Sequence, residues 1–307
     1  MFTIFVFYGI IPSMSDNVKK KTVSFSQFQN WYSCPNKWYL DYVKGLKIFE
    51  DSLNMSFGTA IHETMQAYLR ALYNKSESHA ERMDMMKFFT RAFKVQITKK
   101  NIPHTQAQLD EFIEDGQKIL DAFRQIDNRL KHFPTDKYML LDIEHELKIE
   151  IKNNVEITAY LDLVLKERMT GKIKIIDIKT ATQGWNNYQK EDFTKTSQLV
   201  LYKALYSKKY NIPLHMIDVE FFIVKRKLYE NSSYEQSHIQ IFKPKSNQAD
   251  VLQVINEFGG FVNECFTPEG EYKPAMKHPK IPGKYNRNCK YCPHKKVNCD
   301  AVPDVIV

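Results

Sequence analysis

Residues 157–180 read ITAYLDLVLKERMTGKIKIIDIKT, and this stretch decides the fold that we expect. It predicts two short strands joined by a tight turn. The first strand carries Asp162, and the second ends in Asp177-Ile178-Lys179. Because side chains alternate along a strand, Asp177 and Lys179 should point to one face while Ile178 points into the core.

Two carboxylates and a lysine at one sheet edge suit metal-dependent hydrolysis of a phosphodiester bond. Carboxylate oxygens are the ligands that a magnesium-type ion prefers. Such an ion activates water and neutralises the phosphate, and a lysine adds fixed positive charge. The same spacing also suits a surface salt bridge on an exposed hairpin, so the pattern alone leaves both interpretations open.

The composition indicates a globular protein with a polyanionic partner. The chain has 307 residues, of which 43% are hydrophobic and 13% aromatic, enough for one elaborated domain or two. Its net charge of +8 favours a nucleic acid. Residues 271–300 hold eight Lys or Arg against two acids, interleaved with Tyr272, Tyr285 and Tyr291. The short runs at 19–21 and 225–227 are more typical of a solvated surface.

The apolar chain start could be a short signal-like or anchoring segment, although it does not match a typical secretion signal. No stretch reaches the roughly 20 apolar residues of a membrane span. Residues 1–13 are apolar but lack a basic start and a cleavage site. We therefore expect a cytoplasmic protein whose translation begins at Met14, with residues 1–21 a flexible or miscalled N-terminus and 301–307 a tail.

The apolar periodicity predicts an α/β or α+β fold. A helix should follow Ser24, a good N-cap residue. Further helical spacing occurs over 56–73, 78–99, 105–131, 196–209 and 247–265. Strand patterns cover 138–151, 155–167, 172–179, 215–224 and 236–243.

Cysteine spacing predicts a metal site near the C-terminus. The five cysteines stand at positions 34, 265, 289, 292 and 299, and the last three form C-x2-C-x6-C. The odd count and the absence of a secretion signal disfavour disulfides. A fourth ligand could be Cys34 or Cys265, and His294 could replace a cysteine in a zinc site. Zinc and an iron–sulfur cluster both fit the spacing.

In chain order, the motifs resemble the RecB-like branch of the PD-(D/E)xK nuclease superfamily, especially its iron–sulfur members, such as AddB nuclease domains and the nucleases of CRISPR spacer acquisition. The resemblance covers most of residues 22–300. It departs from the family at Ala159, where a glycine is usual, and in the last cysteine gap, which is often five residues. The matching segments are the opening at 24–39 with Cys34-Pro35, G-x-x-x-H at 58–62, the acidic strand position at Ile143-Glu144, Asp162 of G-x-x-D, D-x-K-T at 177–180, Q-x-x-x-Y at 198–202 and the cysteine trio.

The resemblance implies a set of site residues. A Mg or Mn ion would be held by His62, Asp162, Asp177 and the backbone of Ile178. Lys179 would stabilise the transition state. The implied catalytic set is completed by Gln198 and Tyr202, which would support Lys179 or contact DNA, and a 4Fe–4S cluster would bind Cys34, Cys289, Cys292 and Cys299.

Several of these residues also have ordinary structural interpretations. A lone histidine on an apolar helix, such as His62, is usually a satisfied core or surface group. Gln198 and Tyr202 could simply pack against the sheet. Glu144 could be a strand-surface charge, and Glu146 competes with it for the acidic role.

The resemblance also implies a fold and a function. The fold would be α/β with a restriction-endonuclease-like core, a mixed central sheet flanked by helices, in one domain over 22–300 (helical part 56–135, catalytic core 136–245, cluster-binding tail 246–300). The activity would be that of a metal-dependent DNA exonuclease acting on ends or single strands, in recombination, repair or phage DNA processing. Lacking a Walker A loop, the chain would carry no helicase motor of its own and could work with a separate helicase or recombination protein. The alternatives are an inactive DNA-binding module of this fold and a zinc-stabilised RNA-binding protein.

Overall fold

A computed structural model of the chain describes residues 20–49, 51–273, 278–283 and 287–300. The expected translation start at Met14, the tail over 301–307 and Tyr285 lie outside these residues. Within the described ranges, no helix is both long and apolar enough to cross a bilayer.

After the short strand β1, which the sequence did not predict, the elements follow the expected order of helices, a strand meander, then helices and strands. The helices are α1 (Phe25–Ser33), α2 (Pro35–Trp38), η1 (Tyr39–Val43), α3 (Leu53–Asn74), α4 (Glu77–Glu81), α5 (Met85–Lys99), α6 (Gln106–Arg124), α7 (Ile126–His132), α8 (Asn187–Glu191), α9 (Phe193–Tyr210), η2 (Leu214–Met216), α10 (Gln248–Cys265) and α11 (Arg287–Lys290). The strands are β1 (Lys21–Val23), β2 (Tyr138–Glu150), β3 (Val155–Glu167), β4 (Ile173–Ala181), β5 (Ile217–Lys225) and β6 (Ile239–Phe242).

The strands form one mixed sheet in which β3 is the central connector. The sheet order is β1-β3-β4-β5-β6, and β2 also pairs with β3. The β4–β5 pair is parallel, whereas β2–β3, β3–β4 and β5–β6 are antiparallel. The strand predicted over 155–167 is confirmed as β3, whose 13 residues pair with three other strands.

One edge of β3 is only partly covered. β2 pairs along the whole of one edge, so β1 and β4 must share the other. On that edge β1 pairs with Val155–Ile157 and β4 with Leu163–Lys166. Within the described part of the chain, residues 158–162 have no strand partner on this edge, and we call this stretch the β3 gap.

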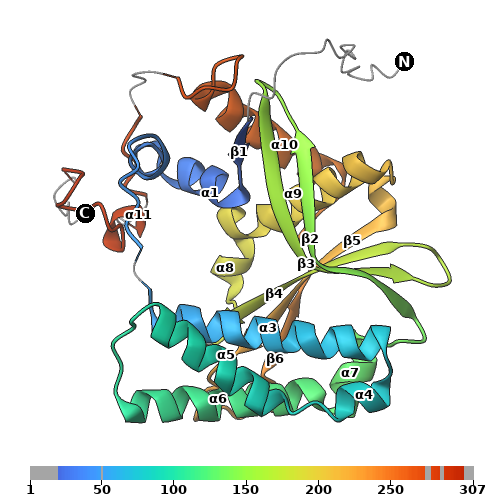
Figure 1. Cartoon of the computed structure of the whole chain (residues 1–307). Helices are drawn as coiled ribbons and strands as arrows, with labels where there is room; N and C mark the ends of the chain where they lie inside the picture. The colour runs from blue at the N-terminus through green and yellow to red at the C-terminus, as the bar shows by residue number, and fades with distance from the viewer. Residues whose placement is uncertain (1–19, 50, 274–277, 284–286, 301–307) are drawn as a thin grey trace.

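Helices cover both faces of the sheet. Figure 1 shows α3, α5 and α6 on one side and α1, α9 and α10 on the other. Adjacent residues of β5 enter two separate cores. Phe221 packs in the cluster that contains α9 and α10 residues, and Phe222 packs in the cluster that contains α3, α5 and α6 residues. Such two-sided burial is typical of a strand in a parallel pair.

The β2–β3 pair twists near its middle, so that side chains on either side of the twist enter different cores. Leu161 and Leu163 should share a face, yet they lie in the two different cores. A register shift in β2 lies between Leu140 and Asp142, and Glu144, opposite this twist, has a φ of 59°. The twist brings the midpoint of both strands close to α3.

The C-terminal tail packs against the first helices. The backbone N–H of Asn36 donates to the Pro279 carbonyl at 3.2 Å, and the Asn288 side chain donates to the Ser33 carbonyl at 2.7 Å. Tyr272 lies against Trp38, at 5.6 Å between ring centroids, so this tyrosine is part of the core rather than a free stacking platform. Tyr291, in contrast, is 84% exposed.

The basic run at 225–227 does not offer free positive charge along its length. Arg226 and Lys227 form ion pairs with the buried Asp115 at 2.8 and 2.9 Å. They tie the end of β5 to α6. The expectation of a solvated surface was therefore wrong for Arg226, whose side chain is only 14% exposed.

Helix packing predicts opposite effects for two glycine-to-alanine substitutions. Alanine normally stabilises a helix interior by up to about 1 kcal/mol over glycine. At Gly116, however, a Cβ would lie 2.3 Å from the buried ring of Phe89, and such overpacking costs about 1–3 kcal/mol. We expect Gly116→Ala to lower the free energy of unfolding by about 1–2 kcal/mol.

The matched control is Gly259→Ala in α10, where a Cβ would meet no atom within 4 Å. It should raise the free energy of unfolding by up to about 1 kcal/mol. Urea denaturation followed by circular dichroism measures both. Equal effects of the same sign would contradict the packing described for α5 and α6.

Candidate active site

The helix α3 delivers His62 to the sheet because Gly58 lets it come close. A Cβ at Gly58 would lie 2.6 Å from Thr180 Oγ1, at the end of β4. Glycine therefore permits a close approach of α3 to β4. His62 stands one turn later on the same helix face and reaches Asp162 on β3.

Asp162 lies where β3 and β4 separate. Their pairing ends at Leu163 and Ile176, so the next pair would have been Asp162 and Asp177. Instead, β4 continues alongside β5. The backbone N–H of Ile178 donates to Asp162 Oδ2 at 2.7 Å. The Asp162 carboxylate thus accepts the hydrogen bond that the backbone of β3 would otherwise accept. The same hydrogen bond holds the carboxylate in place.

Glu144 adopts an uncommon backbone conformation that aims it at the same point. Its φ of 59° lies in the left-handed region, which costs a non-glycine residue about 1–3 kcal/mol. Backbone strain of this kind occurs mainly at functional sites. Here it accompanies a carboxylate that faces His62 across the sheet.

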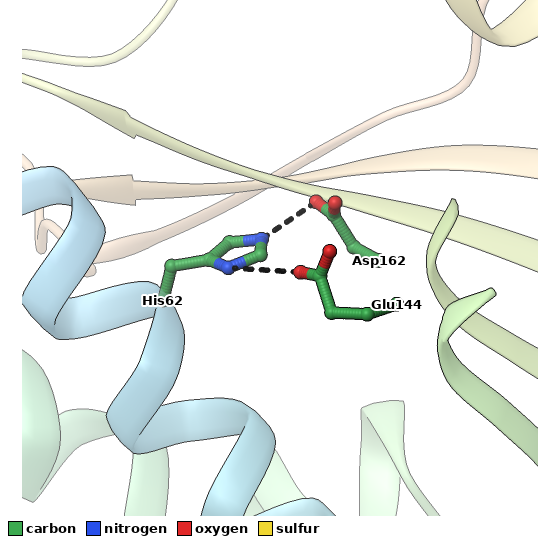
Figure 2. A group of neighbouring side chains, drawn as sticks. All are labelled: His62, Glu144 and Asp162. Atoms are coloured by element: carbon green, nitrogen blue, oxygen red, sulfur yellow. Dashed lines mark ion pairs between the residues drawn. The ribbon is translucent and has the colours of Figure 1, made fainter. Parts of the chain in front are cut away.

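His62, Glu144 and Asp162 converge from a helix and two strands, as Figure 2 shows. His62 Nε2 lies 2.8 Å from Asp162 Oδ2, and His62 Nδ1 lies 3.6 Å from Glu144 Oε1. One ligand atom from each residue falls within 4.8 Å of the other two, a spacing that could hold a metal ion. This arrangement favours Glu144 over Glu146, which instead accepts a hydrogen bond from Tyr160 and pairs with Lys148.

Carboxylates outnumber positively charged side chains at this site. Burial lowers the pKa of His62. The hydrogen bond to Asp162 and the charges of the nearby carboxylates together raise the pKa by a larger amount, so the net shift is upward. The carboxylates around His62 thus favour positive charge at this point. A divalent ion bound by oxygen ligands would neutralise their negative charge, so the donor set fits such an ion.

Asp177 lies beside this group and faces Lys179. The two residues point to the same side of β4, as predicted, and Lys179 Nζ lies 2.8 Å from Asp177 Oδ2. That oxygen is buried and meets no donor in good hydrogen-bond geometry. Burial raises the pKa of Asp177, while the Lys179 charge lowers it less. A buried, incompletely satisfied carboxylate oxygen is what a metal ion would complete.

Lys179 remains positively charged in this setting. Burial lowers its pKa, but the charges of Asp177 and Asp162 raise it more. The prediction that Ile178 points into the core is confirmed, since its side chain is 4% exposed and packs in the α3 core.

Gln198 and Tyr202 lie on α9. They are one turn apart, and the Gln198 side chain donates to Tyr202 Oη at 3.1 Å. Burial and the charges of Asp177 and Asp162 raise the pKa of the Tyr202 phenol, despite an opposing effect of Gln198. Tyr202 therefore lies within electrostatic reach of the carboxylates.

Sequence reasoning missed Gln66, which positions two of the acids. Gln66 is 4% exposed, and its Nε2 lies 2.6 Å from Glu144 Oε1 and 3.4 Å from the Asp162 carbonyl. The signal that could have found it is its place one turn after His62, on the same face of α3.

The structure gathers Cys34 with the terminal cysteine trio at a second site. Cys34, Cys289, Cys292 and Cys299 line one small cavity. Burial and the neighbouring thiols raise the pKa of Cys289. Two N–H groups point at these sulfurs, from Asn36 to Cys299 at 3.4 Å and from Ile281 to Cys34 at 3.5 Å.

The other two candidate ligands lie in different environments. Cys265 is 2% exposed within the α9–α10 core, and burial raises the pKa of its thiol. His294 borders the thiol cavity, but its Nε2 lies 2.7 Å from Asp41 Oδ1 and its Nδ1 lies 3.1 Å from Asn298 Nδ2. Both ring nitrogens are therefore engaged away from the sulfurs.

Comparison with known proteins yields one family and a shared fold. The family model described as the PD-(D/E)XK nuclease superfamily matches residues 22–299. A crystal structure of a provisionally assigned exonuclease from Eubacterium rectale is 13% identical, with a TM-score of 0.52, and the match covers 95% of this chain and 96% of the other. A second solved structure, SSO0001, is 10% identical, with a TM-score of 0.32, and the match covers 81% and 79% of the two chains. No curated protein matches.

Two neighbouring glutamates on β2 provide a matched test of the metal group. We expect Glu144→Gln to weaken Mn²⁺ binding at least about tenfold, because affinity follows the number of charged oxygen ligands. The glutamine keeps an oxygen for Gln66. Glu146→Gln, which removes a charge two residues away, should leave the affinity within about twofold. Isothermal titration calorimetry measures both, and an equal loss in the two variants would contradict the assignment.

Proposed function

The chain belongs to the PD-(D/E)XK nuclease superfamily, with a restriction-endonuclease-like mixed sheet flanked by helices, and we propose that it is a metal-dependent deoxyribonuclease. The observation that carries the proposal is the convergence of His62, Glu144 and Asp162 beside the Asp177–Lys179 pair. These groups meet where two strands separate, so a phosphate can approach the sheet edge.

The protein would supply a fixed set of charges around the scissile phosphate. A magnesium or manganese ion, when bound, would lower the pKa of water and neutralise phosphate charge. His62, Asp162, Asp177 and the Ile178 backbone would hold it, as the sequence suggests, and Glu144 joins this set because of its place beside His62. Gln66 would keep Glu144 oriented through its 2.6 Å hydrogen bond.

Lys179 would stabilise the charge that develops on the phosphate. Its ammonium group is held by Asp177 and carries a pKa above its usual value, so it is charged at neutral pH. A charge fixed before the reaction requires little reorganisation when the transition state forms. Gln198 and Tyr202 would shape the adjoining wall and position the DNA strand.

We infer that the substrate is a DNA end or a single strand, and the activity exonucleolytic. The net charge of +8 favours a polyanion. The same activity is provisionally assigned to the structural neighbour from Eubacterium rectale. Such an enzyme would act in recombination, repair or phage DNA processing, as a RecB-like or AddB-like nuclease that works with a separate helicase or recombination protein.

We further propose that the four gathered thiols bind a structural 4Fe–4S cluster. The four cysteines line one cavity. Side-chain and backbone N–H groups donate to two of the sulfurs, as is common around iron–sulfur clusters, and this favours a cluster.

Replacement of one carboxylate tests the nuclease proposal. With manganese and DNA labelled at the 5′ or 3′ end, we expect cleavage by the intact chain and at least about a hundredfold slower cleavage by Asp177→Ala. Asp218→Ala, an exposed aspartate on the adjoining strand β5, should cleave at the normal rate. Equal cleavage by all three proteins would point to a contaminant, and DNA binding without cleavage would identify an inactive binding module.

Two cysteine variants test the cluster proposal. Anaerobically purified protein should be brown, with visible absorbance and about four iron atoms and four sulfides per chain. Cys34→Ser should lose the colour and melt at a lower temperature, because the link between the first helices and the tail is lost. Cys265→Ser should retain the colour. A colourless protein with stoichiometric zinc would overturn the cluster.

A further inference from the structure

A second pocket lies next to the proposed active site, at the β3 gap. Its volume is about 330 Å³. This is at the lower end of the roughly 300–1,000 Å³ of small-molecule sites, which suits one nucleoside better than a base pair. The lining comprises the end of β1, the start of α1, β3 and one α9 residue: Thr22, Val23, Ser24, Phe25, Ser26, Gln27, Thr158, Ala159, Tyr160 and Tyr202.

The pocket combines apolar walls with a polar end. Val23, Phe25, Ala159 and Tyr202 are each at most 6% exposed and provide apolar surface. A nucleobase has the same two-part character, with apolar faces and a rim of donors and acceptors. The walls therefore match the faces of a base.

Two polar atoms of the lining have no hydrogen-bond partner among the residues that the structure describes. Gln27 is 8% exposed, and its Nε2 donates to the Thr22 carbonyl at 3.2 Å, but its Oε1 is buried without a hydrogen bond. The Thr158 hydroxyl is likewise buried without a partner. Orphaned buried polar groups are rare and costly, so they suggest a ligand that satisfies them. An amide oxygen and a hydroxyl can pair with the edge of a base.

The lining of the pocket contains no charged side chain, so it suits the uncharged base of a nucleotide better than the phosphate. None of the residues that line it is Lys, Arg, Asp or Glu. A phosphate placed there would lose its hydration without gaining a countercharge. A base would instead leave its phosphate outside, where Lys179 and the metal-binding group lie.

The pocket lies close to the proposed metal-binding group, and so to the bond that would be cleaved. Thr158 and Tyr160 precede Asp162 by four and two residues, about 13 and 7 Å along an extended strand. Tyr202 lines the pocket and is also within electrostatic reach of Asp162 and Asp177. A base in the pocket would thus belong to a nucleotide close to the scissile phosphate.

We propose, resting on the nuclease function proposed above, that the β3 gap pocket binds one unpaired nucleobase of the substrate strand near the cleaved bond. The backbone of the β3 gap, the Gln27 amide oxygen and the Thr158 hydroxyl hold the edge of the base. The pocket thereby places the adjoining phosphate at Lys179 and favours single-stranded over fully paired DNA.

An abasic scan tests this placement with the full chain. Labelled single-stranded oligonucleotides carry one abasic nucleotide at successive positions, and single-turnover cleavage is measured at every bond. The wild-type chain should cleave about tenfold more slowly at the bond that lies at one fixed offset from the abasic nucleotide. No fixed offset would overturn the proposal.

Variants of the pocket distinguish base binding from a general defect. Thr158→Val and Gln27→Met should cleave normal DNA about tenfold more slowly and no longer respond to the abasic nucleotide. Because the Thr158 hydroxyl has no partner, Thr158→Val should melt at the wild-type temperature. Thr98→Val on α5, exposed and outside the pocket, should behave as wild type. Variants that keep the wild-type response would overturn the proposal.

A separate readout applies if the wild-type chain cleaves no DNA, which would refute the nuclease function itself. Fluorescence anisotropy then compares binding of the normal and abasic oligonucleotides. Weaker binding of abasic DNA, abolished in Thr158→Val, would support the base pocket on its own. Equal binding of both oligonucleotides would refute it.

Discussion

The site depends on the separation of β4 from β3 at Asp162. Antiparallel pairing between the two strands ends at Leu163 and Ile176, after which β4 follows β5. The Ile178 N–H that β3 would otherwise accept is satisfied by the Asp162 carboxylate at 2.7 Å. The acid proposed to bind the metal ion is therefore also the group that stabilises the separation, because an unpaired buried N–H is costly. The separation also leaves the β3 gap open and so creates the pocket beside the site.

A concentration of negative charge follows from the same geometry. Once the strands separate, Asp162 and Asp177 stand at adjoining positions, and the strained Glu144 adds a third carboxylate from β2. The pKa of His62 is raised and that of Lys179 stays high, because both cations lie among these acids. The free energy of folding bears this repulsion, and a divalent cation would relieve it. The fold is thus less stable than it would be without these neighbouring carboxylates, but it holds them ready at the place where we propose that a metal ion and a phosphate bind.

The cysteine tail joins the ends of the chain around this sheet. Cys34 and the terminal trio face one cavity, and the buried His294–Asp41 contact at 2.7 Å joins the same two segments. The helix α1 starts directly after β1 and supplies Gln27 to the β3 gap pocket. Its last residue, Ser33, accepts a hydrogen bond from Asn288 of the tail. A cluster at the thiols would therefore stabilise the wall of the pocket as well as the tail, because it closes a loop of about 255 residues.

The sequence by itself determined most of the local features, namely the longer helices and strands, the Ser24 cap and the shared face of Asp177 and Lys179. These follow from periodicity and side-chain alternation within one segment. Only the tertiary structure shows that Glu144 rather than Glu146 faces His62, and that Cys34 rather than Cys265 lines the cavity of the cysteine trio. Only it brought in Gln66 and the β3 gap. Each of these depends on which strand pairs with β3 and where that pairing stops. Strand register and backbone strain are long-range outcomes of packing, and no single segment encodes them.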